Sequence, residues 1–308
     1  MIDLEKFTQE YWGLLRRHAY RLTGSILDAD DISQETMLRV VEMGPSLENI
    51  DDHNEWLHTA ATEAAFELLK SHKPVSLEEF DLPDLIQTNG ACTDPNFRSL
   101  EGEDYWPEVP LHFLFPLQYM EPEQRSVVVL RDGFEDGDRM AAEALHVTIP
   151  EVFEIAEEAE KIRSSVRKRW GSTVPFVSLD NNEKSEKVFK RFLEIFQMKD
   201  KVLLQQVMWK NTEMILGPER TTGEDFVATE LASFAKGMGD KIRFSPVWLN
   251  GYRGVLIEDW QELRSEWLRV ALGLILCSDR EVRALKWFLD GHILRKIETD
   301  DTESSLSG

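Results

Sequence analysis

Helical periodicity in the first quarter of the chain is the feature that most limits its possible folds. Apolar residues recur at steps of three and four positions in three stretches, separated by breaks at Gly24 and at Gly44-Pro45. This spacing gives each helix one apolar stripe, and glycine and proline end helices. We therefore expect one helix ending at Gly24, a second ending near Met43 and a third over about 55–71. Together they form a compact helical domain over residues 1–73.

The second of these helices has two distinct faces. Ile32, Thr36 and Val40 keep one apolar face, with Ala29 and Leu38 beside it. Six polar residues populate the other face, and we call them the acidic ridge: Asp28, Asp30, Asp31, Gln34, Glu35 and Arg39. Carboxylates near the N-terminal end of a helix are also common on ordinary solvated surfaces. The ridge is therefore either a solvated face or a docking surface.

The preceding helix carries arginines on or near its expected polar side. They are Arg16, Arg17 and Arg21.

Composition sets outer limits on the class of protein. The 308 residues are 42% hydrophobic with a net charge of -22, and no run of about 18 apolar residues or signal-peptide pattern occurs. We expect a cytoplasmic protein without membrane contact. Cys92 and Cys277 lack the spacing of a metal site or a disulfide framework, so no metal is expected. The negative charge opposes broad contact with DNA, so any DNA contact must be local or come through a partner.

The sequence motifs on either side of the acidic aspartates are more specific for a protein family than the acidic ridge itself. Arg21-Leu22-Thr23-Gly24-Ser25 precedes it, and Gln34-Glu35-Thr36 follows its aspartates. This order resembles the core-polymerase-binding part of region 2 in bacterial extracytoplasmic-function (ECF) RNA polymerase sigma factors. The resemblance implies that the acidic ridge binds the β′ clamp of core RNA polymerase.

The third helix resembles the promoter-melting segment of the same family. Trp56-Leu57 match the family's Trp-Leu pair, whereas Glu63 and Glu67 stand where the family commonly has Asn and Asp. An exposed aromatic side chain can stack on a base of single-stranded DNA. The alternative is that Trp56 and Phe66 are core residues of the helical domain. The resemblance implies promoter contacts at Trp56, Lys70 and Lys73.

Residues 74–110 are expected to form an acidic linker. Five prolines and Asn89-Gly90 leave little room for a long helix. Its end, Tyr105 to Leu111, resembles imperfectly the Trp-Leu-Pro-Glu-Pro-Leu motif of sigma factors that carry a C-terminal extension.

Residues 111–170 resemble sigma region 4. Pro116 to Arg131 is similar to the opening of that region, and Met140 to Thr148 has the pattern of the first helix and turn of a helix-turn-helix. Ile149 to Val166 would then be the recognition helix, which in such motifs lies in the DNA major groove.

The expected recognition helix departs from the family in its charge. It carries Glu154 and then Glu157-Glu158-Ala159-Glu160, whereas the family usually has basic residues. Carboxylates facing phosphates are repelled, so this helix is not expected to read a -35 element. Basic residues near the helix end are the candidates for contacts with the DNA backbone: Arg163, Arg167, Lys168 and Arg169.

The remaining chain changes from helical to mixed character. We expect helices over 188–196, 202–207 and 226–236, and strands over 212–216, 242–249, 254–258 and 267–277. Residues 183–298 resemble the SnoaL-like domain, an α+β cone of the nuclear-transport-factor-2 (NTF2) type that is appended to some sigma factors. Residues 299–308 are expected to form a disordered tail. The overall fold class is therefore mainly α, with two helical sigma-type domains followed by an α+β cone.

The sequence offers no support for catalysis. It contains no HExxH, P-loop, GxGxxG or nucleophile-elbow motif. His292 stands alone in the C-terminal region, where a structural role is expected because a base needs a positioned partner. We expect no enzymatic activity and no cofactor.

Two functions agree with these observations. The first is a sigma-factor-like protein that binds core RNA polymerase, helps open promoter DNA and is tuned by its C-terminal domain. The alternative is a sigma-like adaptor or regulator that docks on polymerase while a separate DNA-targeting protein supplies the promoter. An anti-sigma factor is a further possible partner.

Overall fold

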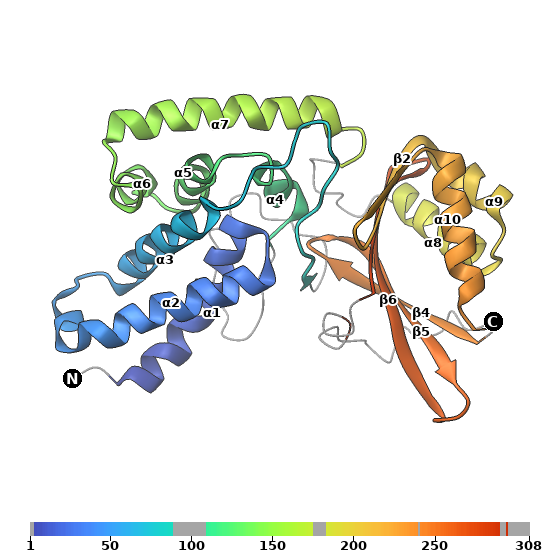
Figure 1. Ribbon diagram of the computed structural model, residues 1–308, viewed down its shortest axis with the longest axis horizontal. Helices are drawn as coiled ribbons and strands as arrows, with labels where there is room; N and C mark the ends of the chain where they lie inside the picture. The colour runs from blue at the N-terminus through green and yellow to red at the C-terminus, as the bar shows by residue number, and fades with distance from the viewer. Residues whose placement is uncertain (1–2, 89–108, 175–182, 240, 290–293, 295–308) are drawn as a thin grey trace. The chain divides into compact units, whose positions relative to one another are not determined.

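The computed structural model describes residues 3–88, 109–174, 183–239, 241–289 and 294. The chain divides into two compact units, of residues 1–84 with 94–169 and of residues 85–93 with 170–308. Figure 1 shows the first unit as helices and the second as a sheet with helices. In the described part of the chain, no helix is long and apolar enough to span a membrane.

The first three helices follow the expected boundaries closely. Each begins at a side-chain cap, from Asp3, Ser25 and Asp52 respectively, which accepts backbone N–H groups of the first turn. Gly24 ends the first helix with φ 69, a left-handed conformation that glycine adopts without strain. A Cβ there would also meet the Gln118 side chain. The helices are α1 (Leu4–Thr23), α2 (Ile26–Met43) and α3 (His53–Leu69), with a 3-10 turn η1 (Gly44–Asn49) after α2.

Two expectations for these helices were wrong. Arg17 and Arg21 are buried, with 6% and 4% of their surface exposed, although we expected them on or near a polar side. Helix α1 packs against α2, α3 and α5, so neighbouring helices cover more than one of its faces. Leu38, expected beside the buried stripe of α2, is 58% exposed, because it lies on the face of α2 opposite its buried residues.

The helix-turn-helix is present with longer helices than expected. His146, at φ 56, ends the first helix, and the Thr148 N–H and hydroxyl both donate to the Glu151 carboxylate at 2.7 Å at the start of the next. The segment comprises α4 (Leu111–Leu117), α5 (Pro122–Gly133), α6 (Gly137–Leu145) and α7 (Ile149–Trp170). Figure 1 shows α7 lying across α5 and α6.

The two helical segments pack together in one unit. Helix α3 contacts both α5 and α6. Phe66 of α3 packs against the apolar cluster that includes Val127, Leu130 and Met140 of α5 and α6. The segments 1–73 and 111–170, which the sequence suggested as separate domains, therefore share a buried interface.

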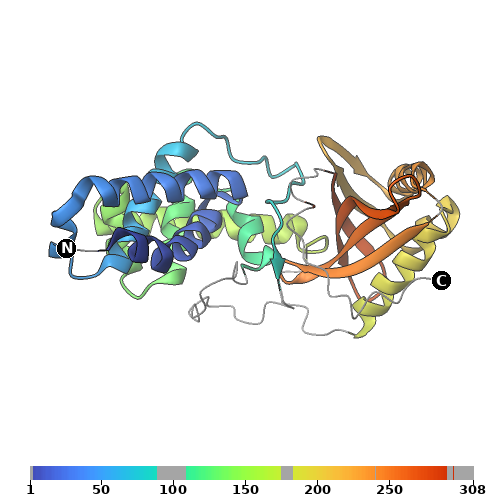
Figure 2. The same ribbon diagram turned by 90° about the horizontal axis from the view of Figure 1, so that it is seen from below.

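The second unit is built on a seven-stranded sheet in the order β1-β4-β5-β6-β7-β2-β3, in which only β2 and β7 are parallel. Its helices α8 to α10 cover one face of the sheet (Figure 2). The strands are β1 (Gln87–Thr88), β2 (Met208–Leu216), β3 (Glu219–Thr222), β4 (Ile242–Leu249), β5 (Tyr252–Gln261), β6 (Glu266–Cys277) and β7 (Val282–Phe288). The helices are α8 (Glu183–Gln197), α9 (Lys201–Val207) and α10 (Glu224–Gly237).

The expected helices and strands of this unit are present, and three strands were missed: β1, β3 and β7. The residues expected as a tail, 299–308, and His292 lie outside the described residues.

Aromatic side chains fill the space between the sheet and its helices. The Phe196 and Trp287 rings stack with centroids 5.6 Å apart, and both side chains are buried. Gly273 allows Trp287 to lie against β6, because a Cβ at this position would come within 2.5 Å of the indole ring.

Candidate functional site: the acidic ridge of helix α2

Contacts with neighbouring helices and with Asp84 hold the backbone of helix α2 in place, and one face of the helix remains outside these contacts. Its buried residues, including Ile32, Thr36 and Val40, pack in the helical unit, where α2 contacts α1 and α3. At its start, the Ile26 N–H donates to the Asp84 carboxylate at 2.9 Å. The opposite face is fixed in orientation, as a docking surface requires.

The six residues of the acidic ridge lie in two different environments. Asp31, Gln34 and Glu35 are exposed. Asp30 is half-buried and forms an ion pair with Arg16 of α1. Arg39 is also half-buried and bonded within the protein, whereas Asp28 is half-buried near the N-terminus of the helix. The exposed part of the ridge is therefore formed by Asp31, Gln34 and Glu35.

Arg39 contacts one carboxylate on its own helix and one on the neighbouring helix α3. Its Nη1 lies 2.7 Å from the Glu63 carboxylate of α3, and its Nε lies 3.5 Å from the Glu35 carboxylate one turn earlier on α2. Its guanidinium group therefore bridges the ridge to the neighbouring helix.

Sequence reasoning missed an apolar part of the same face. Leu27, Leu38 and Val41 are 67%, 58% and 56% exposed. They lie at helical spacing from Asp31 and Gln34, and this spacing is the signal that could have identified them. Exposed apolar side chains beside carboxylates on one helix fit a helical partner that offers apolar and basic side chains.

The candidate DNA contacts of α3 are not gathered into one surface. Trp56 is half-buried at the start of the helix, and Lys73 is exposed beyond its end. The Lys70 ammonium group pairs with Glu67 at 2.5 Å and lies 4.2 Å from the centroid of the Phe66 ring. Phe66 itself packs against α5 and α6, in agreement with the alternative that it is a core residue.

Two histidines are buried between the helices of this unit. His18 and His58 meet edge to face with ring centroids 4.7 Å apart, and the Phe134 ring lies 4.7 Å from His58. Desolvation lowers the pKa of His58 to about 4, although its Nδ1 is 2.7 Å from the Asn54 carbonyl oxygen. Desolvation also holds the pKa of His18 well below its usual value. Both rings are neutral at pH 7.

The four candidate basic residues of α7 differ in exposure. Arg163 is half-buried and pairs with Asp132 at 2.9 Å and with Glu160 at 3.5 Å. The other three, Arg167, Lys168 and Arg169, are exposed in the last turn. Four carboxylates of the same helix are also exposed: Glu154, Glu157, Glu158 and Glu160.

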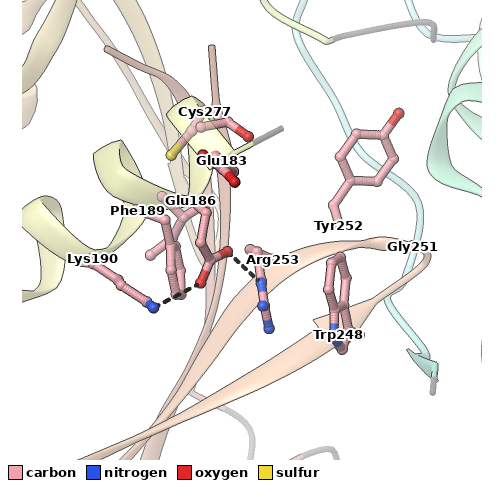
Figure 3. Close-up of a pocket in the computed structure, with 11 residues that line it drawn as sticks. Glu183, Glu186, Phe189, Lys190, Trp248, Gly251, Tyr252, Arg253 and Cys277 are labelled. Atoms are coloured by element: carbon pink, nitrogen blue, oxygen red, sulfur yellow. Dashed lines mark hydrogen bonds and ion pairs between the residues drawn. The ribbon is translucent and has the colours of Figure 1, made fainter. Parts of the chain in front are cut away.

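The second unit contains a cavity of about 400 Å3 between the start of α8 and the turn that joins β4 to β5. Figure 3 shows the Glu186 carboxylate between Lys190 and Arg253, at 3.7 Å and 2.8 Å. The Arg253 guanidinium group lies 4.0 Å from the centroid of the Trp248 ring. Burial raises the pKa of the Cys277 thiol, so this side chain is a poor nucleophile. The charged side chains of the lining thus neutralise one another, and they lie beside apolar side chains.

The first three helices match a known protein family. Residues 7–74 match the family model Sigma-70 region 2. The chain is 25% identical over 217 residues to the ECF RNA polymerase sigma factor SigG of Mycobacterium tuberculosis, covering 64% of this chain and 57% of SigG. It is 31% identical over 153 residues to the ECF sigma factor SigJ of the same organism, covering 48% of this chain and 47% of SigJ. The matches thus span about half the length of these curated relatives.

The crystal structure of Mycobacterium tuberculosis SigJ shares the fold. It superposes with a TM-score of 0.63 at 19% identity, over 97% of this chain and 100% of SigJ. The expected fold class, helical sigma-type segments followed by an α+β cone, is confirmed, and so is the resemblance to ECF sigma factors.

Proposed function

We propose that this chain is a sigma-factor-like transcription initiation protein that binds core RNA polymerase through α2 and helps open promoter DNA. The proposal rests on its sigma-70 region 2 and on its similarity to ECF sigma factors. The observation that carries it is the exposed face of α2, where Asp31, Gln34 and Glu35 lie between exposed leucine and valine side chains. The partner surface is the β′ clamp of core polymerase, and the protein acts in the cytoplasm without catalysis of its own.

Promoter opening is assigned to α3. Trp56, with Lys70 and Lys73, supplies an aromatic ring and two cations for a single strand. The C-terminal unit tunes the complex, and it holds part of the linker in its sheet through β1.

A second candidate function is favoured by the surface of α7. Its exposed glutamates oppose a recognition helix that reads base edges in the major groove. A sigma-like adaptor would keep the polymerase contact of α2 and leave DNA targeting to a separate protein, while backbone phosphates touch only the basic last turn of α7. An anti-sigma factor would compete for the same polymerase-binding face.

Run-off transcription with core polymerase and this protein alone separates the two candidates. The primary proposal predicts transcripts from a defined promoter, and they persist when the -35 sequence is scrambled because α7 does not read it. Transcripts that require a particular -35 sequence would refute the adaptor candidate and our reading of α7. No transcripts despite tight binding to polymerase would refute the primary proposal and favour the adaptor.

A further inference from the structure

The cavity at the start of α8 lies at one end of the aromatic core of the second unit. Within that core, Phe196 packs against Phe192, Phe244 and Trp287, so aromatic rings occupy the space between the sheet and its helices. The cavity lies where α8 begins and β4 turns into β5, and it measures about 400 Å3. Small-molecule sites usually have volumes of about 300–1,000 Å3, so a compact ligand fits.

The lining of this cavity has an apolar part and a charged part. The apolar part consists of buried side chains from α8 and β6: Phe189, Ile275 and Cys277. The charged part keeps contact with solvent, since 29% of Glu186, 61% of Lys190 and 26% of Arg253 is exposed. A ligand with an apolar body and one charged group matches both parts, because its body leaves water while its charge remains paired.

The charges of the lining balance, but its hydrogen-bond donors and acceptors do not. Both oxygens of the Glu186 carboxylate are engaged, one by Nε of Arg253 at 2.8 Å and the other by Nζ of Lys190 at 3.7 Å. Among the residues that the structure describes, no acceptor receives a hydrogen bond from the two terminal amino groups of Arg253. A guanidinium group has five N–H donors, so the site offers donors to a ligand that brings an acceptor.

The Arg253 side chain is held in one orientation. Figure 3 shows its guanidinium group between the Glu186 carboxylate and the Trp248 ring, whose centroid lies 4.0 Å away. A fixed guanidinium group binds a carboxylate through two parallel hydrogen bonds, and its terminal edge is available for this geometry. The N-terminal end of α8 lies at the same cavity, and a helix dipole favours a negative group there.

We propose that this cavity binds an organic acid with an apolar body. The carboxylate of the ligand accepts hydrogen bonds from the terminal amino groups of Arg253, and Lys190 supplies a second positive charge. The body of the ligand lies against Phe189, Ile275 and Cys277. A cationic ligand is disfavoured, because two cations already engage Glu186. The C-terminal unit is thereby a receptor for a small molecule.

Matched probes separate the charged group of the ligand from its body. Three compounds share a naphthalene ring and differ in charge: naphthoate, naphthamide and naphthylmethylammonium. Decanoate offers the same carboxylate on a different apolar body. Isothermal titration calorimetry of the free full-length protein gives each dissociation constant. We expect the two acids to bind at least about tenfold more tightly than naphthamide or the ammonium compound, because charged hydrogen bonds are stronger than neutral ones.

Variants at Arg253 test the contact with the carboxylate. Arg253→Gln removes the charge and the guanidinium group, whereas Arg253→Lys keeps the charge without the planar arrangement of donors. We expect binding of both acids to weaken about tenfold or more in Arg253→Gln and by less in Arg253→Lys, while naphthamide binding stays unchanged. Arg264→Gln is the matched control, because it makes the same change at a side chain that is 70% exposed and outside the cavity lining. Urea unfolding first confirms that each variant folds.

Hydrogen exchange locates the bound acid in the wild-type protein. Saturating naphthoate should slow exchange in residues 183–190 and 248–253, which include the lining of α8 and of the β4–β5 turn. Absence of binding by both acids would overturn the proposal, and so would binding of naphthamide or the ammonium compound as tightly as naphthoate. Protection confined to other segments, or undiminished acid binding in Arg253→Gln, would overturn the assignment to this cavity. None of these measurements uses polymerase, so their outcome is separate from that of the proposed function.

Discussion

Asp30 and Asp31 are adjacent in sequence but have different surroundings. Asp30 pairs with Arg16 of α1, whereas Asp31 is exposed. We expect Asp30→Asn to lower the free energy of unfolding by about 1 kcal/mol, because the half-buried Arg16 loses its charged partner. Asp31→Asn should change it by less than about 0.5 kcal/mol. Urea unfolding of both variants checks this, and an equal loss in both would contradict the assignment of Asp30 to structure.

The buried histidines make the helical unit sensitive to acid. The pKa of His58 is about 4 in the folded protein and near 6.5 in the unfolded chain, so between these values the unfolded chain binds a proton that the folded protein does not. Stability should therefore fall as pH drops from about 6.5 toward 4, by about 1.4 kcal/mol per pH unit for this histidine. Above about pH 6.5 the histidine adds no pH dependence.

Unfolding by urea at several pH values measures this dependence. His58→Leu should reduce the slope, whereas His72→Gln should leave it unchanged because His72 is exposed. An identical slope in wild-type protein and His58→Leu would contradict the burial of a neutral His58.

The position of strand β1 depends on the side chain of Asn250. The Asn250 side-chain oxygen accepts the Ile86 N–H at 2.9 Å, and the Asn250 N–H donates to the Ile86 carbonyl at the same distance. Asn250 is buried at φ 47, in the left-handed region that asparagine tolerates. Asn250→Gly keeps this backbone conformation accessible and removes the side-chain acceptor of the Ile86 N–H.

We expect Asn250→Gly to destabilise the second unit by about 1–3 kcal/mol, since a buried N–H loses its acceptor. Hydrogen exchange of residues 85–88 should accelerate. Thr88→Val is the matched control, because it removes the hydroxyl that accepts the Gly251 N–H at 3.2 Å and should have a smaller effect. Unaltered exchange in Asn250→Gly would show that other contacts hold β1.

Elements with strong local signals were predictable from the sequence. The period of α2 and the stops at Gly24 and Gly44 defined its boundaries, and the acidic ridge followed from the same period. Strand β1 has only two residues, and its pairing with β4 depends on residues at least 160 positions away. The burial of Arg17 and Arg21 could not be predicted from the local pattern either, because it comes from the packing of several helices, α2, α3 and α5, around α1. Long-range packing is not encoded in a local period.

The net charge of -22 and the acidic first half of α7, residues 149–160, both disfavour binding to duplex DNA. A protein that neutralises few phosphates loses little affinity when salt is raised. We expect binding of the free protein to duplex DNA to be weak and to depend only slightly on salt concentration. A steep loss of duplex affinity between low and physiological salt, measured by anisotropy, would contradict this and restore α7 as a DNA-binding helix.

We propose that the exposed face of α2 binds core RNA polymerase, and a titration of labelled protein with core polymerase measures this binding. We predict that Asp31→Lys combined with Gln34→Ala weakens binding by at least about tenfold, which corresponds to about 1.4 kcal/mol. Glu194→Lys, an equal charge change at an exposed position of α8, should bind as the wild type does. Undiminished binding of the Asp31→Lys, Gln34→Ala variant would contradict the claim.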